Sequence, residues 1–296
     1  MAGGNILISG AEMVLPSGII TGDLRIKDGI ITEISTNDRL IQNENEIHFD
    51  AKGLHLLPGG IDPQVHFREP GDEIKEDLES GSAAAASGGI TSFLDMPNNK
   101  PAATTVDSIL AKIESASKKC ITNFGFFIGA TPYNIKELRK AVGKPGAGIA
   151  IPGICGIKIF MGSSTGDLLV HEEAHLANIF ENTAGLIAVH AEDENRLNQR
   201  IKLMDNRNDI AAHAEWRDDI TALNATQLAV GFAKKTGHRL HILHLTSGIE
   251  ADFLSELNED ERLQITTETL PQHLTFDETD VERLDVRLKM NPPIRY

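Results

Sequence analysis

From Leu56 onward the chain repeats one pattern: a short apolar run, a loop, and then a segment with helical character. Seven apolar runs follow this pattern, and helices are expected near residues 75–88, 106–119, 134–142, 172–182, 219–236 and 249–257. Strands that alternate with helices form parallel sheets whose strands are joined by crossovers. The pattern therefore predicts a (β/α) barrel or a doubly wound sheet.

Polar residues close five of the apolar runs where each strand is expected to end: His66, Asn98, Lys158, His190 and His244. In a (β/α) barrel the carboxyl ends of all strands meet at one mouth, where catalytic groups are built. This placement favours the barrel, a TIM-like α/β fold. Such a barrel has eight strands, but only seven runs precede Tyr296. We therefore expect either a chain truncated at its C-terminal end or a barrel that closes in an unusual way.

Residues 1–55 differ in character, because short β-rich runs are separated by turn signals. Asp28-Gly29 lies between two alternating apolar runs and predicts a two-residue hairpin turn. The expected domains are a small antiparallel β domain of the sandwich type over residues 1–55 and a barrel over residues 56–296.

Composition limits the classes of function. A formal charge of −15 argues against binding to nucleic acid or to an anionic membrane surface, since both need basic patches. The most apolar window, residues 149–162, contains prolines and glycines and is too short to span a bilayer. There are only two cysteines, Cys120 and Cys155, and no signal-peptide pattern begins the sequence. We expect a cytoplasmic protein.

The segment LLPGGIDPQVHFREPG, residues 56–71, is the most informative motif. An apolar strand ends there in a charged turn that contains Asp62, His66 and Arg68, and period-2 spacing places these three side chains on one face. His and Asp at a strand end can bind a divalent metal, and a fixed Arg can bind the carboxylate of a substrate.

This segment resembles the first-strand motif of the cyclic amidohydrolases, and the run HFREPG in particular resembles dihydroorotase. The family usually has His-x-His here, whereas this chain has Gln64-Val65-His66, so an amide replaces one expected imidazole ligand. Two other segments resemble the same family, DMPNNKP around Asn98 and KMNPPIR around Asn291. The resemblance covers nearly the whole chain.

The resemblance implies a metal site at the barrel mouth, with one or two zinc ions per chain. The implied metal ligands are His66, His190 and His244, with Gln64 as a further candidate, because neutral imidazole nitrogens suit zinc. Either His190 or His244 alone could equally be a hydrogen-bonded structural residue. His241 lies three residues before His244, so we expect it on the opposite strand face, toward the helices, in a structural role.

Lys158 lies inside an apolar run, where a free ammonium group would be costly to desolvate. A strand lysine usually extends to the sheet edge. The resemblance implies instead an N-carboxylated lysine, a carbamate formed with carbon dioxide that bridges two metals. Asp62 and Lys158 are the implied catalytic residues, and the family's proton-shuttling aspartate after strand eight is not found in this sequence.

Three residues are implied to bind the substrate, namely Arg68, Asn98 and Asn291. An arginine can bind a carboxylate bidentately, and each asparagine offers a donor and an acceptor to a ring amide. Asparagine near proline is also common in simple turns. The implied function is the reversible cyclisation of N-carbamoyl-L-aspartate to L-dihydroorotate in de novo pyrimidine synthesis, through a metal-activated hydroxide.

Two other functions remain open. An allantoinase or hydantoinase would share the metal residues but act on a different ring, whereas an inactive dihydroorotase-like subunit would serve as a scaffold for an aspartate transcarbamoylase. Gln64 and the missing eighth strand favour the scaffold, while Asn98, Asn291 and the HFREPG run favour a carboxylate-bearing substrate. The expected partners are a small-molecule substrate, further copies of the chain in a homo-oligomer and, in the scaffold alternative, the transcarbamoylase.

Overall fold

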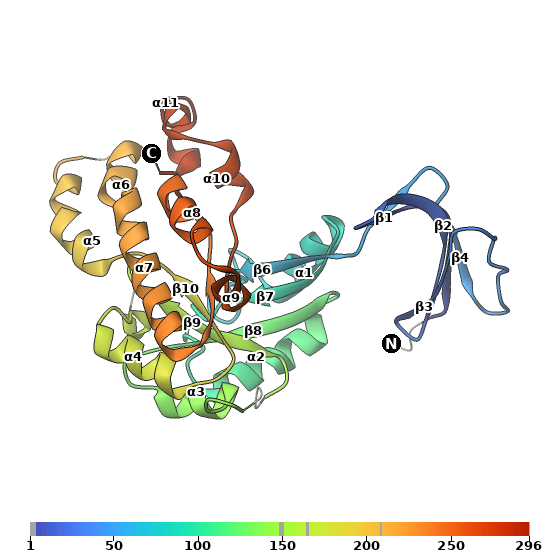
Figure 1. The fold of residues 1–296 in the computed structure, drawn as a ribbon, viewed down its shortest axis with the longest axis horizontal. Helices are drawn as coiled ribbons and strands as arrows, with labels where there is room; N and C mark the ends of the chain where they lie inside the picture. Colours follow the sequence, from blue (N-terminus) through green and yellow to red (C-terminus); the bar gives the residue numbers. More distant parts are fainter. Residues whose placement is uncertain (1–3, 148–150, 164–165, 208, 296) are drawn as a thin grey trace. The chain divides into compact units, whose positions relative to one another are not determined.

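The computed structural model describes residues 4–147, 151–163, 166–207 and 209–295. Its contacts divide the chain into two compact units, Met1–Gly60 and Ile61–Tyr296 (Figure 1). The boundary expected from the sequence followed residue 55.

The N-terminal unit is a single five-stranded sheet with the order β3-β2-β1-β4 and with β5 also beside β1. Its strands are β1 (Ile6–Leu15), β2 (Gly18–Lys27), β3 (Ile30–Ser35), β4 (Ile47–Asp50) and β5 (His55–Leu56). The first three are antiparallel, but β4 and β5 pair with β1 in parallel. The prediction of a wholly antiparallel domain was therefore wrong, because the loop over residues 36–46 returns the chain to the start of β1.

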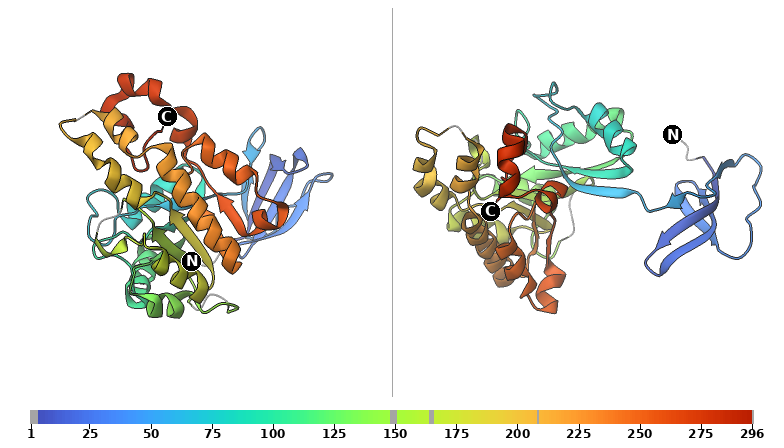
Figure 2. Two further views of the ribbon diagram at one scale, coloured as in Figure 1. Left: turned by 60° about the vertical axis from the view of Figure 1, so that its left-hand side comes forward. Right: turned by 90° about the horizontal axis from the view of Figure 1, so that it is seen from above.

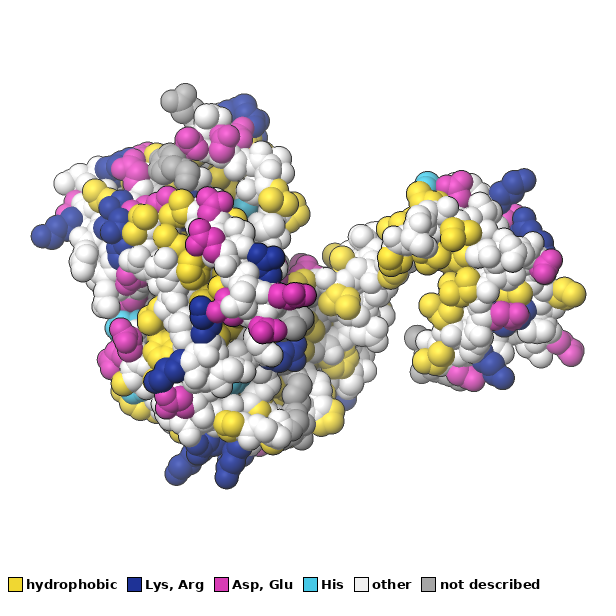
Figure 3. All heavy atoms as spheres, viewed as in Figure 1, with side chains coloured by type: hydrophobic (Ala, Val, Ile, Leu, Met, Phe, Trp, Pro, Cys, Tyr) yellow, Lys and Arg dark blue, Asp and Glu magenta, His cyan; other side chains and the backbone are white. Residues whose placement is uncertain are grey.

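The predicted hairpin turn is confirmed. Asp28 and Gly29 have φ angles of 51° and 79°, and they join the paired residues Lys27 and Ile30. Two consecutive positive φ angles define the turn that matches the twist of a hairpin. Apolar side chains also remain exposed on this unit (Figure 3), and they include Ile19, Ile30, Ile31, Ile34, Ile47 and Phe49.

The C-terminal unit contains a curled seven-stranded sheet with the order β12-β11-β10-β9-β8-β7-β6 (Figures 1 and 2). Its strands are β6 (Gly60–Val65), β7 (Ile90–Asp95), β8 (Asn123–Gly129), β9 (Ile154–Phe160), β10 (Leu186–His190), β11 (Arg239–Ile242) and β12 (Ile265–Thr267). From β7 to β12 the neighbouring strands are parallel. The predicted fold, a TIM-like sheet of seven strands with a small N-terminal sheet domain, is confirmed.

Helices lie between these strands, and two more follow β12. They are α1 (Leu78–Ser87), α2 (Val106–Lys119), α3 (Ile135–Val142), α4 (Glu173–Asn182), α5 (Glu194–Arg200), α6 (Ile210–Trp216), α7 (Asp219–Thr236), α8 (Gly248–Ser255), α9 (Glu259–Gln264), α10 (Pro271–Thr275) and α11 (Val281–Leu284). All six expected helices are present, whereas α5, α6, α9, α10 and α11 were not anticipated. Among the described residues, no helix has both the length and the apolar character needed to cross a membrane.

Local sequence signals explain where helix α2 begins and ends. Thr105 caps its N-terminus in a reciprocal pair with Ser108, and Asp107 lies in the first turn. Lys118 and Lys119 occupy the last turn, where cations interact favourably with the helix dipole. This helix supplies Lys112, which lies behind the functional site.

The alternation of side chains along the strands separates two faces of the sheet. Phe93, Ile157 and Ile242 belong to the large cluster that packs against the helices, whereas Ala188 and Leu243 belong to a smaller inner cluster.

The strand register places His241 on the inner face. Lys158, Ala188, His241 and Thr266 are aligned across β9 to β12, so their side chains share one face. The expectation that His241 faces the helices was therefore wrong. It failed because β11 ends at Ile242 and the regular alternation does not extend to His244, which has a φ of 38°.

Candidate active site

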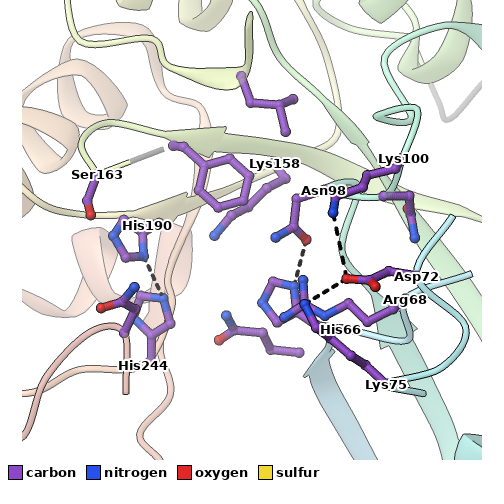
Figure 4. A pocket seen from close by; sticks show the side chains of 15 residues that line it. His66, Arg68, Asp72, Lys75, Asn98, Lys100, Lys158, Ser163, His190 and His244 are labelled. Atoms are coloured by element: carbon purple, nitrogen blue, oxygen red, sulfur yellow. Dashed lines mark hydrogen bonds and ion pairs between the residues drawn. The ribbon is translucent and has the colours of Figure 1, made fainter. Parts of the chain in front are cut away.

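A cavity of about 510 Å³ lies at the carboxyl ends of the strands (Figure 4). Its walls include eight residues expected from the sequence, namely Gln64, His66, Arg68, Asn98, Lys158, His190, His244 and Asn291. Asp62 is not a lining residue, and its carboxylate accepts the backbone N–H of Gln64 at 3.1 Å. Burial, followed by the nearby charge of Glu268, raises the pKa of Asp62.

His190 and His244 face each other across one side of the cavity. His190 Nδ1 and His244 Nε2 are 3.0 Å apart, and both side chains are buried. Burial lowers the pKa of each ring, so both imidazoles are neutral near pH 7. Two neutral nitrogens this close must either share a proton or bind one cation between them.

Glu192 fixes the orientation of His190, since its Oε2 lies 2.7 Å from His190 Nε2. Burial alone would raise the pKa of Glu192, but the contact with His190 and the charges of Arg295 and Arg217 hold it well below its usual range. A carboxylate at this position accepts the Nε2 proton and leaves Nδ1 as the free lone pair. That arrangement is typical of histidines that bind metals.

Two buried arginines neutralise Glu192. Arg217 donates to both of its oxygens, and Arg295 donates to Oε1 at 2.8 Å. Arg217 also donates to Asn291 Oδ1 at 2.7 Å. Because a guanidinium only donates, the amide oxygen of Asn291 is used there, and its Nδ2 group is left as the donor.

Lys158 lies on β9 with a relative exposure of 1%. Its Nζ has no hydrogen-bond partner within the described part of the chain and lies 4.5 Å from the centre of the Phe160 ring. Burial lowers the pKa of Lys158 well below its ordinary value. An amine with a lowered pKa loses its proton more readily than a free lysine and is then available to react or to bind.

His66 and Gln64 are further candidate metal ligands in the same cavity. His66 Nδ1 lies 2.7 Å from Asn98 Oδ1, and burial, with the charges of Lys158 and Arg68, lowers the pKa of His66 to about 3. If Nδ1 carries the proton, His66 Nε2 is a free lone pair. Gln64 Oε1 is buried and finds no partner among residues whose placement is described.

Arg68 lines the cavity and lies away from His190 and His244 (Figure 4). Its guanidinium forms no hydrogen bond or ion pair with any residue that the structure describes. Lys75 and Lys100 lie close by and share one carboxylate, Asp72, at 2.7 Å and 3.8 Å. This wall therefore carries an excess of positive charge within an acidic protein.

Sequence reasoning missed Glu192 and Arg217. Glu192 follows His190 by two residues, and the i,i+2 spacing in an extended segment could have suggested a shared face. Arg217 had no such signal, because it reaches Glu192 across 25 positions from the loop after α6.

The chain belongs to the amidohydrolase family, whose sequence model matches residues 55–277. A dihydroorotase of Methanosarcina mazei is 35% identical over 301 residues, covering 98% of this chain and 63% of that protein. An allantoinase of Deinococcus radiodurans is 33% identical over 302 residues, covering 98% and 64%. The resemblance to the cyclic amidohydrolases is thereby confirmed.

The solved structure of L-hydantoinase (dihydropyrimidinase) from Arthrobacter aurescens superposes with a TM-score of 0.87 at 26% identity. The match covers 99% of this chain and 64% of that one. The chain thus spans less than two thirds of the length of these relatives.

Proteins of this family generally use metal ions. Within the described ranges, no group of three or more His, Cys, Asp or Glu side chains is arranged to hold one. The donors that do converge are the facing nitrogens of His190 and His244, the unpartnered amine of Lys158 and the unpartnered oxygen of Gln64. Because two of these groups are buried without a partner and the two imidazole nitrogens face each other, the set fits a metal, provided that Lys158 supplies the anionic donor that the set lacks.

Proposed function

We propose that the protein is a metal-dependent cyclic amidohydrolase and, within that class, a dihydroorotase. It would interconvert N-carbamoyl-L-aspartate and L-dihydroorotate. The observation that carries the proposal is the unpartnered Arg68 guanidinium in the same cavity as the facing His190 and His244 rings. One wall suits a carboxylate and the other suits the metal.

The hydrogen-bond donors of the substrate-binding residues favour a ring that carries a carboxylate. Arg68 and the Nδ2 group of Asn291 both donate, and so does Asn98 when its oxygen accepts from His66. A carboxylate and a ring carbonyl present only acceptors to such a wall. Allantoin has carbonyl acceptors but no carboxylate for Arg68, and the alkyl or aryl group of a typical hydantoin would meet charge.

His190, His244, Lys158, His66 and, more weakly, Gln64 are the residues that would hold zinc. Lys158 would serve as its carbamate: the neutral Nζ bonds to the carbon of carbon dioxide, one proton is released, and an anionic group with two oxygens results. When bound, the metal activates water and polarises the carbonyl that water attacks.

The side chains of the cavity would then orient the substrate and the ligands. Arg68 would hold the substrate carboxylate in a fixed plane, while Asn98 and Asn291 would donate to its remaining acceptors. Glu192 would keep the His190 proton on Nε2 and so keep Nδ1 available.

Substrate competition tests this function. The full-length, metal-loaded protein should turn over dihydroorotate with a kcat/KM well above its values for allantoin and for hydantoin. A preference for either neutral ring would refute the dihydroorotase assignment but keep the class. Metal-loaded protein that is inactive on all three would favour the inactive scaffold for a transcarbamoylase.

Arg68→Lys is expected to raise the KM for dihydroorotate at least about 10-fold, because a point charge cannot reproduce the planar fork of a guanidinium. One charge-assisted hydrogen bond contributes about 1.5–3 kcal/mol. Steady-state kinetics and metal analysis of the same preparations provide the measurement. Metal content should not change. An unaltered KM in an active variant would remove Arg68 from the substrate site.

Gln64→His is expected to strengthen a second metal site. An amide oxygen is a poor zinc ligand, so the wild-type protein should hold one zinc firmly and a second weakly. An imidazole at this position should bring the tightly bound zinc toward two ions per chain, measured by elemental analysis after dialysis. Gln64→Asn, which keeps the amide, is the control. Equal zinc in all three proteins would exclude residue 64 from the metal site.

A further inference from the structure

A buried polar cluster lies behind the cavity wall, formed by Asp95 at the end of β7, Lys112 of α2 and Asn99. Lys112 Nζ donates to Asp95 Oδ2 at 2.6 Å, to Asn99 Oδ1 at 2.7 Å and to the Met96 carbonyl at 3.2 Å. The side chains of Asp95 and Lys112 are 0% and 2% exposed. Lys112 does not line the cavity, so it cannot touch a ligand there.

The remaining polar atoms of this cluster bind the main chain on both sides of Arg68. Asp95 Oδ1 accepts the Phe67 N–H at 3.0 Å, while Asn99 Nδ2 donates to the carbonyls of Phe67 at 3.1 Å and Glu69 at 2.9 Å. The oxygen and both hydrogens of the Asn99 amide are therefore engaged. Although Asn99 borders the cavity, it has no donor left for a substrate.

Stability alone does not explain this cluster. Burial raises the pKa of Asp95 to about 6 even with Lys112 alongside, and burial lowers the pKa of Lys112. Both shifts oppose the charged forms, and a buried ion pair is commonly no more stabilising than apolar residues of similar volume. What apolar residues could not supply is the set of directional bonds to Phe67 and Glu69.

Packing around the segment also limits its movement. The Phe67 ring lies 4.7 Å from the Phe93 ring, and a Cβ on Gly81 would come within 2.6 Å of the Phe67 ring. At Gly71, where φ is 101°, a Cβ would lie 2.0 Å from the Lys100 carbonyl. The chain on either side of Arg68 therefore packs closely against α1 and against the loop after β7. The hydrogen bonds of the polar cluster fix the position of its backbone.

We propose that Asp95, Lys112 and Asn99 are positioning residues that hold the Phe67–Arg68–Glu69 backbone, and thereby set the preference of the site for ring substrates that carry a carboxylate. The inference rests on the proposed function, in which Arg68 binds that carboxylate. Bidentate binding requires placement to within about 0.5 Å. Lys158 lies on β9, His190 ends β10 and His244 follows β11, so loosening the segment would weaken carboxylate recognition much more than binding of the zinc that these three residues would hold, although His66 adjoins Phe67.

The test compares an anionic substrate with a neutral one of nearly the same shape. In full-length, metal-loaded protein, kcat/KM is measured for dihydroorotate and for its methyl ester, and the acid-to-ester ratio reports carboxylate recognition. Lys112→Met should lower this ratio about 10-fold or more, mainly through the KM of the acid, with the firmly bound zinc retained. Lys118→Met makes the same change on the same helix at an exposed residue outside the cluster, and it should leave the ratio unaltered. A fall in both activities at a constant ratio would mean that Lys112 only stabilises the fold, and would overturn the proposal.

A second variant and a second measurement keep the proposal testable if Lys112→Met does not fold or if the wild-type protein turns over neither compound. Asn99→Ala removes the two donors to Phe67 and Glu69 but retains the Asp95–Lys112 pair. Hydrogen exchange at the Arg68 amide, whose peptide group includes the Phe67 carbonyl that Asn99 binds, should accelerate at least about 10-fold in this variant, with no change at the amides of β10. Unchanged exchange would overturn the positioning role whatever the substrate. If the wild type turns over neither dihydroorotate nor its methyl ester, the proposed function is refuted. The hydrogen-exchange result then decides whether the cluster holds the backbone of residues 67–69.

Discussion

Lys158→Met is expected to stabilise the metal-free protein while it abolishes metal binding and activity. The Nζ of Lys158 is buried at 1% exposure with no hydrogen-bond partner in the described residues. An unsatisfied buried donor costs about 1–3 kcal/mol, and methionine has a similar length without that donor. In a unit of this size each kcal/mol shifts Tm by roughly 2–4 °C, so Tm should rise by several degrees. Activity should fall at least about 10²-fold, because a metal ligand is lost.

Lys112→Met is the matched comparison, since it makes the same change at a second buried lysine. Lys112 has three acceptors, and its loss leaves Asp95 as an uncompensated buried carboxylate, so the free energy of unfolding should fall by about 3–5 kcal/mol. Thermal and urea unfolding of chelator-treated proteins measure both changes. If Lys158→Met lowers Tm as well, then Lys158 takes part in the stability of the fold. If Lys158→Met keeps the zinc content and turnover of the wild type, Lys158 is not a metal ligand.

The parts of this protein that follow from local pattern were predictable. The α2 boundaries, Val106–Lys119, agree with the expected segment, because the capping residues and the terminal lysines are adjacent in sequence. His66, Lys158 and His190 were expected near one mouth because each closes an apolar run, and all three line the same cavity. The hairpin turn at Asp28-Gly29 was equally predictable, since its geometry depends on two residues.

What could not be predicted depends on contacts between distant segments or on local departures from regular geometry. The parallel pairing of β4 with β1 depends on the path of a long loop. The face of His241 was predicted wrongly because the strand ends before the positive φ of His244. A positive φ at a residue other than glycine costs energy and is often found at functional sites, and here it brings His244 to His190.

The buried charged residues behind the cavity wall could not be predicted from the sequence either. Arg295 reaches Glu192 across 103 positions, and Lys112 reaches Asp95 across 17. A buried charge pair has no periodicity that marks its two partners, and an isolated Lys or Glu in a sequence is ordinarily a surface residue. Eight lining residues of the site were therefore accessible to sequence reasoning, while Arg217, Arg295 and Lys112 behind them were not.

Glu192→Ala is expected to destabilise the fold by about 3–5 kcal/mol, since it leaves two buried guanidinium groups without a counter-charge. The side chains of Glu192, Arg217 and Arg295 are each no more than 2% exposed. The same variant removes the acceptor of His190 Nε2, so zinc affinity should fall by about 10- to 100-fold in whatever fraction remains folded. Urea unfolding of the metal-free protein and competition with a chelating dye measure the two effects.

The control for Glu192→Ala is Glu181→Ala, which breaks an ion pair with Lys235 at the surface. Exposed pairs contribute about 0–1 kcal/mol, so this variant should remain close to the wild type. Glu192→Gln separates charge from shape, because it retains an oxygen for one arginine but cannot neutralise two, and its stability should lie between those of the wild type and the alanine variant. If both Glu192 variants have the same free energy of unfolding as Glu181→Ala, Arg217 and Arg295 must find other acceptors when Glu192 is lost. The position of Arg217, and with it the orientation of Asn291, would then not depend on the buried carboxylate.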